Sequence, residues 1–409
     1  MNKLMKKNVF AILFGILLIS RLIVLTQTSF INFDWTLYEL MYLFVLCAIL
    51  CVDLYVRKIK IKIKNLPIIE ILMGIYIFLF GLVLVNPLIF GLTRSNFLSH
   101  AFFVIVLLIT GIYIKQNNLW RTFLFTSFYS IAIFMFIKLI TNLNELNLTN
   151  IIYIFSTSKR VRSEFGFNHA NTLGNVCLCV IILWSFINKY KSKGMIKLLN
   201  FSILAMAVAM MLCSASRSSI TGTILFFGVN YLYSNKNGLL NKKSNQTLKV
   251  IGVIFVLIVV TSYAIGMSFT DVLEDSNRDF LFTHTIPMFL KTDRVMIGLG
   301  FASNVAYGDH LTPYLTYFLD NGFVYTFVAT GVVGSLIYLL NLCFIGKNVF
   351  AKTNNIFRSN LISLFIIYLY VALFEATLFS SGFFTNYVFI VIFSVYIYDE
   401  KRNMRRVAR

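Results

Sequence analysis

Charged residues are scarce in this sequence of 409 residues, of which only 13% are charged and 58% are hydrophobic. A water-soluble domain of this size would not carry the long apolar runs that recur from end to end of the chain. The alternation of apolar and polar residues that marks a transmembrane β-barrel is also missing. The composition therefore predicts an all-α polytopic membrane protein, with residues 1–409 forming a single integral membrane domain.

A pattern of ligands for a metal ion is also lacking. The six cysteines all lie inside apolar segments. Cys47 and Cys51 are one helical turn apart, but no histidine or carboxylate pattern completes a site beside them. We therefore interpret the cysteines as buried free thiols, and we predict neither a bound metal nor a cofactor.

Acidic residues are few, with 16 Asp and Glu against 36 Lys and Arg, so the formal net charge is +20. Such an excess can indicate a protein that binds nucleic acid. Here the basic residues lie in short segments between apolar runs, where they set the orientation of a membrane protein. We therefore exclude nucleic acid as a partner and expect contact with membrane lipids.

Apolar runs of about 20 residues, the length that spans a bilayer, predict twelve helices. They cover approximately residues 8–28, 36–56, 67–87, 97–114, 121–141, 168–188, 198–214, 217–233, 250–268, 322–345, 360–378 and 383–398. With the N-terminus inside, 26 of the 36 lysines and arginines fall in inner segments, as the positive-inside rule requires. We therefore predict that both termini are cytoplasmic. The long connections 142–167 and 269–321 then lie outside, and the second is a large extracytoplasmic loop before the tenth span.

Eight cations fall on the outer side, against this trend, so orientation does not explain them. They are Arg94, Lys159, Arg160, Arg162, Arg217, Arg278, Lys291 and Arg294. A guanidinium binds phosphate through two parallel hydrogen bonds and keeps its charge, which suits it to pyrophosphate. The alternative is contact with lipid headgroups or with acidic residues of the outer loop. We favour the alternative for Arg94, Lys159 and Lys291, and phosphate binding for Arg162, Arg217 and Arg278.

The segment FGFNHANTLG, residues 165–174, gathers polar residues at the start of the sixth span. Gly166 would relax the entry to this helix. Asn168 or Asn171 could cap it, and the positive end of the helix would then face an anion. His169 is either a polar residue at headgroup level or part of a site.

Another polar cluster, formed by Asp309, His310, Asp320 and Asn321, precedes the tenth span. A carboxylate at this depth could act as a general base toward a sugar hydroxyl, with Asn321 orienting it. The alternative is an N-cap, because Asp or Asn before an apolar run commonly caps a helix.

Charged residues inside the spans are costly, at about 2.5–3.5 kcal/mol for a central Arg, Lys or Asp on insertion scales. The candidates are Arg21, Glu39, Glu70, Lys138 and Glu375. They indicate either an ion pair between spans or an ion pathway.

Motifs on the outer side together resemble those of Wzy-type capsular and O-antigen polysaccharide polymerases, in the O-antigen ligase/polymerase superfamily. They are FGFNHANTLG at 165–174, SRSS at 216–219, the loop from Arg278 to GLGF within 277–301, and DNGFVYTFVATGVVG at 320–334. The chain departs from the family pattern at Ala170, where proline is common, and at Asp320, where the ligase branch has histidine. The second departure favours a polymerase over a ligase.

The resemblance implies a GT-C-like, metal-independent, inverting glycosyltransferase at the outer face of the cytoplasmic membrane. It would join oligosaccharide repeat units, carried on polyprenyl pyrophosphate, into capsule, exopolysaccharide or O-antigen, with a flippase and a chain-length regulator as possible partners. The implied pyrophosphate and glycan ligands are Arg162, Arg217 and Arg278, supported by Arg160, Arg294, Asn168, Asn171 and Asn321. The implied general base is Asp320, followed by His310 and His169.

Other functions stay open on the sequence alone. A ligase of the same superfamily would move finished glycan to lipid A, wall polymer or protein, and a scaffold or length regulator would have no catalytic site. A twelve-span transporter or flippase of lipid-linked oligosaccharide would show repeated halves and polar residues near the midplane. The sequence has no convincing repeat, and its conspicuous polar clusters lie at the outer rim.

Overall fold

The computed structural model describes residues 3–26, 35–57, 87–147, 162–190, 194–234, 285–299, 321–351, 356–375 and 384–398. These ranges are mainly helical, and their one isolated β-bridge joins Thr26 to Phe167. The long helices are α1 (Lys3–Val24), α2 (Trp35–Arg57), α4 (Pro87–Asn117), α5 (Trp120–Thr141), α6 (Ala170–Ile187), α7 (Met195–Ser214), α8 (Arg217–Ser234), α15 (Gly322–Ala351), α16 (Arg358–Ala372) and α17 (Asn386–Tyr398). Short helices are η2 (Leu143–Glu145) and α13 (Ile286–Leu290).

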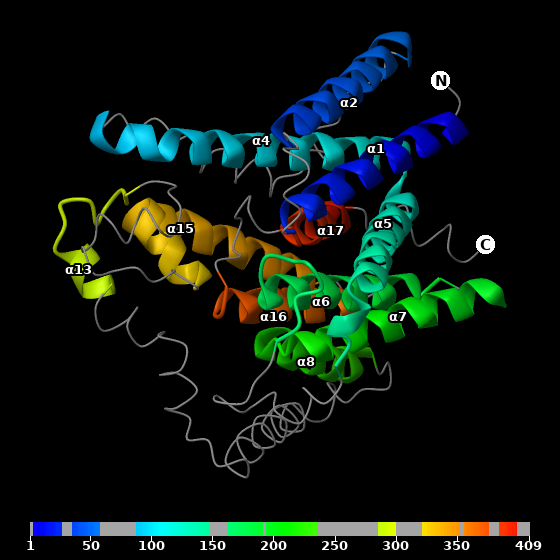
Figure 1. The fold of residues 1–409 in the computed structure, drawn as a ribbon. Helices are drawn as coiled ribbons and strands as arrows, with labels where there is room; N and C mark the ends of the chain where they lie inside the picture. The colour runs from blue at the N-terminus through cyan, green and yellow to red at the C-terminus, as the bar shows by residue number, and fades with distance from the viewer. Residues whose placement is uncertain are drawn as a thin grey trace.

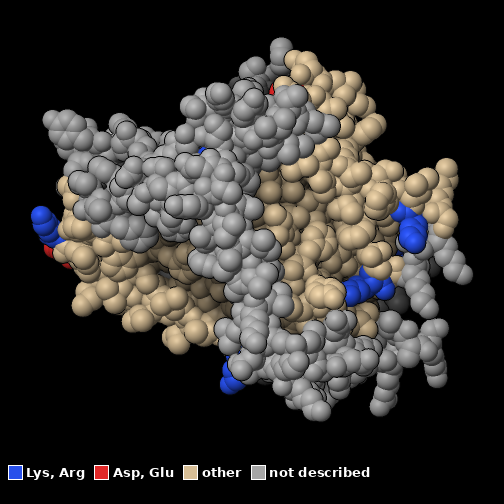
Figure 2. Space-filling model, turned by 90° about the horizontal axis from the view of Figure 1, so that it is seen from below, with Lys and Arg blue, Asp and Glu red and all other residues tan. Residues whose placement is uncertain are grey.

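Apolar helices of membrane-spanning length make up much of the described chain. Five helices, α1, α5, α6, α7 and α15, are long and apolar enough to cross a bilayer. Four shorter apolar helical stretches lie at Glu39–Val52, Ala101–Asn117, Arg358–Ala372 and Asn386–Val395. On the face shown in Figure 2, the described lysines and arginines form separate blue patches on a mostly uncharged tan surface. The described helices therefore define a multi-span helical membrane protein.

The predicted spans differ from the observed helices mainly at their ends. The span predicted at 97–114 begins earlier, since α4 starts at Pro87, and the span predicted at 322–345 extends to Ala351 and is broken at Gly331. Hydropathy does not show such breaks, because the residues on both sides are equally apolar. The predicted span 250–268 and nearly all of 67–87 lie outside the described residues.

Helix α6 is the central element of the bundle, packed against α5, α7, α8 and α16. Its sequence is apolar on all sides, which is the pattern of a helix buried on all sides. Leu173, Val180, Leu183 and Phe186 are fully buried along its length. In Figure 1, α1, α2 and α4 lie on one side of the molecule and α6, α7, α8 and α16 on the other, with α5 and α17 between them.

The two ends of α6 lie at two separate ends of the bundle. At the first, the Asn168 N–H donates to Leu25 O (2.9 Å) and the Ser163 N–H donates to Cys213 O (3.1 Å). We call this the His169 end; α1, α5 and α7 end there, and α6 and α8 begin there. The 18 residues of α6 span about 27 Å, so the other end of the helix is far away.

At that other end, Tyr190 follows α6 and its ring lies 6.0 Å from Phe125 and 5.6 Å from Phe357, centroid to centroid. Phe125 is near the start of α5, and Phe357 directly precedes α16. We call this the Tyr190 end. Segments that the sequence predicts to be outside thus meet at the His169 end, and segments predicted to be inside meet at the Tyr190 end.

A buried ion pair joins α1 to α2. Nη2 of Arg21 lies 2.6 Å from Oε1 of Glu39, and both residues are almost fully buried. The Tyr387 hydroxyl, from α17, accepts a hydrogen bond from Arg21 and donates one to Glu39. The edge of the Tyr387 ring meets Phe103 of α4, with 4.7 Å between centroids. The ion-pair alternative is therefore confirmed for Arg21 and Glu39, while Glu70 lies outside the described residues.

The six cysteines are free thiols, as predicted, but they are not all buried. Cys177, Cys179 and Cys213 are buried, whereas Cys47 is half-buried and Cys51 and Cys343 are exposed. The prediction was wrong for these last three because an apolar membrane helix presents one face to lipid, so apolar surroundings in sequence do not imply burial in the protein.

Candidate functional site

The loop before α6 is held to the end of α5 by Glu145. Its Oε2 accepts hydrogen bonds from the backbone N–H groups of Glu164 (2.7 Å) and Phe165 (2.6 Å). Ser163 Oγ donates to the Glu145 carbonyl (2.8 Å). Sequence reasoning missed Glu145, because its partners are 18 to 20 residues away. A carboxylate in a predicted outer loop is the one local signal that could have indicated it.

The FGF part of the motif reverses the chain at Gly166. Phe165 and Gly166 both have positive φ, 48° and 71°, and Phe165 and Phe167 are fully buried. A Cβ on Gly166 would lie 3.3 Å from Asn142 Nδ2 and 3.4 Å from Lys138 Nζ. The predicted role of Gly166 is thus confirmed, and the ammonium group of Lys138 lies at the His169 end, beside this loop.

His169 is the N-cap residue of α6. Its backbone is extended, and its Nδ1 accepts a hydrogen bond from the Asn171 N–H at 3.1 Å. Because Nδ1 is the acceptor, the neutral ring carries its proton on Nε2. The prediction that Asn168 or Asn171 caps the helix was therefore wrong. The Asn168 side chain instead donates to Val24 O (3.3 Å) at the end of α1.

Arg162 lies over the first turn of α6. Its Nη2 donates to the Asn171 side-chain oxygen, and the next residue, Ser163, is bonded to the end of α7 through Cys213 O (3.1 Å). A half-buried guanidinium therefore lies beside the N-terminal end of a helix, and both carry positive charge. This combination favours an anion.

The SRSS turn, residues 216–219, packs directly on α6. Ser216 Oγ donates to Ser219 Oγ (3.0 Å), and Ser219 Oγ donates to Asn175 Oδ1 (3.1 Å). A Cβ on Gly174 would lie 2.5 Å from Ser216 Cβ, so only glycine fits without displacing the turn. The motif 165–174 therefore contacts the motif 216–219 through its last residue.

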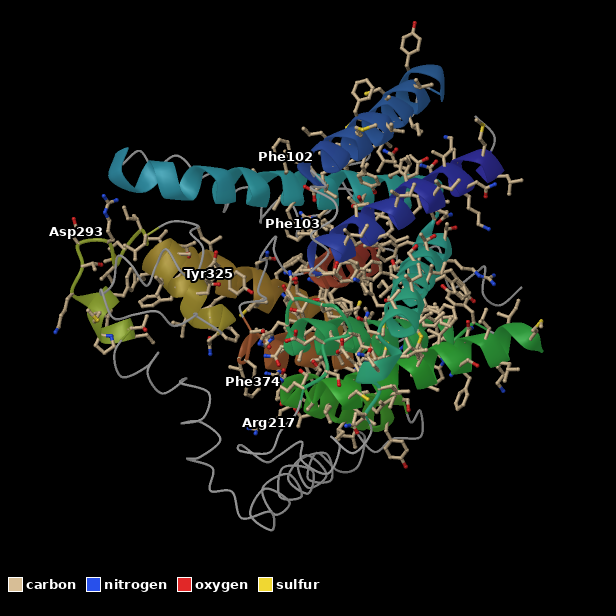
Figure 3. All side chains as sticks on the ribbon, viewed as in Figure 1. Phe102, Phe103, Arg217, Asp293, Tyr325 and Phe374 are labelled. Atoms are coloured by element: carbon tan, nitrogen blue, oxygen red, sulfur yellow. The ribbon has the colours of Figure 1, made fainter. Side chains whose placement is uncertain are left out.

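Arg217, the first residue of α8, is held at the His169 end by this packing. Its carbonyl accepts a hydrogen bond from Thr221 Oγ1 (2.6 Å), and Figure 3 shows its side chain at the start of the helix. Ser216, the residue before Arg217, belongs to the turn. At the start of the same turn, the Ser214 hydroxyl donates to Met211 O (2.7 Å). The hydroxyls of Ser214, Ser216 and Ser219 thus hold the turn, and the turn positions Arg217.

Asn321 caps α15. Its Oδ1 accepts hydrogen bonds from the N–H groups of Phe323 and Val324 (both 3.0 Å), and its Nδ2 donates to Leu373 O (3.1 Å). The N-cap alternative is therefore confirmed for Asn321. These bonds also join α15 to the end of α16.

The Asn321 cap belongs to the same end of the bundle as Arg217. One turn before Leu373, Tyr370 shares a hydrogen bond with Thr221 of α8. The Tyr370 ring also packs on Phe374, with 5.0 Å between centroids. The start of α15 therefore belongs to the His169 end.

The GLGF turn, residues 298–301, begins where the backbone meets the break in α15. Gly298 (φ 79°) and Gly331 (φ 65°) face one another, and a Cβ on either would lie 2.4–2.5 Å from backbone atoms of the other segment. Leu299 N–H donates to Val328 O (2.8 Å), and Val332 N–H donates to Val295 O (2.9 Å). A turn therefore lies at Gly298, and it docks on the later span at Gly331.

Arg294 is placed apart from the other described arginines. Its Nε lies 3.9 Å from the Asp293 carboxylate, and its carbonyl accepts the Gly298 N–H (2.7 Å). Within the described ranges, none of its hydrogen bonds or ion pairs reaches the His169 end. Figure 3 shows Asp293 at a different edge of the molecule from Arg217.

The structure therefore brings six of the predicted site residues to one end, without Arg294. They are Arg162, Asn168, His169, Asn171, Arg217 and Asn321. Arg160, Arg278, His310 and Asp320 lie outside the described residues, and their roles stay predictions.

A scan against protein-family models gave no match, and a search of curated proteins gave none that is significant. The class of the protein therefore comes from the fold itself. It is a multi-span helical membrane protein in which two arginines and a helix N-terminus meet at one end of the bundle.

Proposed function

We propose that this protein is a polysaccharide polymerase, which joins oligosaccharide repeat units carried on polyprenyl pyrophosphate at the outer face of the cytoplasmic membrane. The observation that carries the proposal is the contact between Gly174 and Ser216. It joins two of the motifs that resemble those of the polymerase family. Arg162, three residues before the first motif, and Arg217, within the second, both lie at the His169 end.

The reaction would be an inverting glycosyl transfer. A sugar hydroxyl of the acceptor repeat unit attacks the anomeric carbon of the donor glycan, and the bond to the lipid pyrophosphate breaks. The electron pair leaves with the pyrophosphate, and the hydroxyl proton passes to a base. Fixed guanidinium groups stabilise the developing charge on the leaving group, which is the role proposed for Arg162, Arg217 and Arg278.

The proposed base is Asp320, with His310 second and His169 third. His169 ranks last because its Nδ1 already accepts the Asn171 N–H. In the neutral ring Nε2 then carries the proton, so this nitrogen is a donor rather than a base. Within this proposal, the docking of Gly298 on Gly331 holds the outer loop against the span that follows Asp320 and Asn321.

The proposal is tested by deleting the gene and following the lipid-linked glycan. A strain without a polymerase accumulates single repeat units on the outer face. A strain without a flippase would hold them inside, and a strain without a ligase would still make long polymer but not attach it. Either of the last two results would overturn the proposal.

Complementation of the deletion tests the site. Arg217→Ala and Arg162→Ala should abolish long polymer at normal protein levels, because each removes a guanidinium from the leaving group. Lys291→Ala is the matched control, since Lys291 is an exposed cation on the same predicted outer side. A strain complemented with Lys291→Ala should make polymer of unchanged length. Gly174→Val, which would push the SRSS turn off α6, should fail as Arg217→Ala does. Normal polymer from Arg217→Ala would remove the site assignment.

A further inference from the structure

A cavity of about 310 Å³ opens at the Tyr190 end, between the end of α6 and the start of α7. Three of its lining residues are apolar (Trp184, Leu198 and Phe201), and three are polar (Asn188, Lys197 and Asn200). It is separated from the His169 end by the length of α6, so it is not part of the proposed polymerase site. A cavity with one apolar wall and several hydrogen-bond donors is suited to an amphiphilic ligand.

Asn200 supplies a buried donor to this cavity. The residue is 5% exposed, and its Oδ1 accepts a hydrogen bond from the Tyr129 hydroxyl of α5 at 2.8 Å. This bond fixes the amide, so the two N–H groups of Nδ2 are on the other side. Within the described part of the chain, the one side-chain hydrogen bond of Asn200 is the one its Oδ1 accepts, so the Nδ2 group can donate to a molecule in the cavity that the residue lines. An amide donor of a mostly buried residue needs such an acceptor, from a ligand or from water.

Two positive groups lie at the same cavity, a lysine and the N-terminal end of α7. Lys197 lines it, and α7 begins beside it without a side-chain cap, at Gly194. The first N–H groups of a helix attract anions. The ligand that fits these donors is an anion, and phosphate oxygens accept hydrogen bonds from lysine, amide and helix N–H groups alike.

The apolar wall continues onto a surface that faces outward from the protein. Leu198 and Phe201 are 67% and 60% exposed, and Met195 at the start of the same helix is 86% exposed. In a membrane protein such side chains contact acyl chains rather than water. The charged and apolar parts of the cavity are therefore arranged like the headgroup and acyl chain of a phospholipid at the bilayer interface.

We propose that this cavity binds the headgroup phosphate of an acidic phospholipid, such as phosphatidylglycerol, in the leaflet at the Tyr190 end. Asn200 and Lys197 donate to the phosphate, and the acyl chain lies along Leu198 and Phe201. The predicted topology makes this the cytoplasmic leaflet, where basic pockets between helices commonly hold acidic lipids. The site goes beyond the proposed glycosyl transfer and does not depend on it.

Quenching of Trp184 fluorescence by lipids with brominated acyl chains tests the site on the full-length protein in detergent. Trp35→Phe and Trp120→Phe leave Trp184 as the one tryptophan of the chain, which has three. Brominated phosphatidylglycerol should quench saturably and at lower concentration than brominated phosphatidylcholine. Lys197→Gln should weaken the phosphatidylglycerol effect about five-fold, from the loss of one lysine near an acidic headgroup.

Matched variants and a soluble anion decide the source of the effect. Lys189→Gln changes an exposed lysine of the same segment that does not line the cavity, and it should leave the affinity within about two-fold. Asn200→Ala removes the amide donor and should weaken quenching by phosphatidylglycerol. Tyr129→Phe, which removes the hydroxyl that fixes this amide from outside the cavity, should weaken it less. Unchanged phosphatidylglycerol affinity in a folded Asn200→Ala variant would overturn the proposal. Equal quenching by both lipids, in the protein with no substitution in the cavity, would mean that Trp184 contacts lipid without selecting the headgroup. Protection by inorganic phosphate alone, at the same concentrations as phosphatidylglycerol, would mean a site for free phosphate. Either result would overturn the proposal.

Discussion

Replacing Glu39 by alanine would leave the guanidinium of Arg21 in the interior without this carboxylate. Arg21 is 7% exposed and Glu39 is 0% exposed, so water screens neither charge. For such a pair, removal of one partner typically destabilises a protein by about 3–5 kcal/mol. An exposed pair would contribute at most about 1 kcal/mol. We expect the larger value for Glu39→Ala, because the pair and Tyr387 together link α1, α2 and α17.

The measurement is equilibrium unfolding of the purified protein in mixed micelles, with loss of helix followed as the fraction of SDS is raised. Lys7→Ala is the matched control, since Lys7 is an exposed cation on the same helix and should change stability by no more than about 0.5 kcal/mol. The triple variant Arg21→Met, Glu39→Leu, Tyr387→Phe should recover most of the loss, because it removes both charges and the hydroxyl they bond.

Two outcomes would refute this reasoning. Stability of Glu39→Ala within about 1 kcal/mol of the unsubstituted protein would show that the pair contributes no more than a surface pair. A triple variant that is stable but no longer supports polymer synthesis would favour the ion pathway over the structural role of the pair.

The remaining predictions concern the His169 end and the break in α15. Under the proposed polymerase function, His169→Asn should keep polymer synthesis, because asparagine is a good N-cap. His169→Ala should lose about 1 kcal/mol of stability in the same SDS titration. Loss of polymer in a stable His169→Asn variant would instead make the imidazole catalytic. Glu145→Gln should expose the loop 162–169 to limited proteolysis, since a neutral amide accepts the two backbone N–H groups less strongly than a carboxylate does; a cleavage rate equal to that of the unsubstituted chain would count against the anchoring role. Gly331→Ala should destabilise the protein by about 1–3 kcal/mol, because its Cβ would lie 2.5 Å from the Met296 carbonyl at a positive φ; Gly346→Ala, in the same helix at an ordinary φ, is the comparison.

Local pattern was enough to predict most of the described helices. The apolar runs at 121–141 and 217–233 nearly coincide with α5 and α8, because the length of an apolar run is set by the bilayer and can be read from consecutive residues. The turns at Gly166 and Gly298 were predictable for a similar reason, since glycine is the residue that takes a positive φ without strain. Arg21 and Glu39 were recognisable as two of five candidate charges inside spans, because such charges are rare, but their pairing was not.

The tertiary structure alone decided which polar residues meet at the His169 end. The sequence offered Asn168 and Asn171 as caps of α6, but the first is bonded to α1 and the second to Arg162, so His169 takes the position. Glu145 became part of the site only because α5 ends beside the loop before α6. These outcomes depend on packing between segments that are distant in sequence, which local propensity does not contain.

The division between sequence and structure is clearest for the arginines. The sequence by itself predicted that Arg162, Arg217 and Arg294 break the positive-inside trend, because that prediction depends only on charge and order along the chain. It could not say which of them lie together. Packing of Ser216 on Gly174 places Arg217 at the same end as Arg162, while docking of Gly298 on Gly331 holds Arg294 elsewhere. Close backbone approach at glycines, which hydropathy does not register, is the physical reason for both placements.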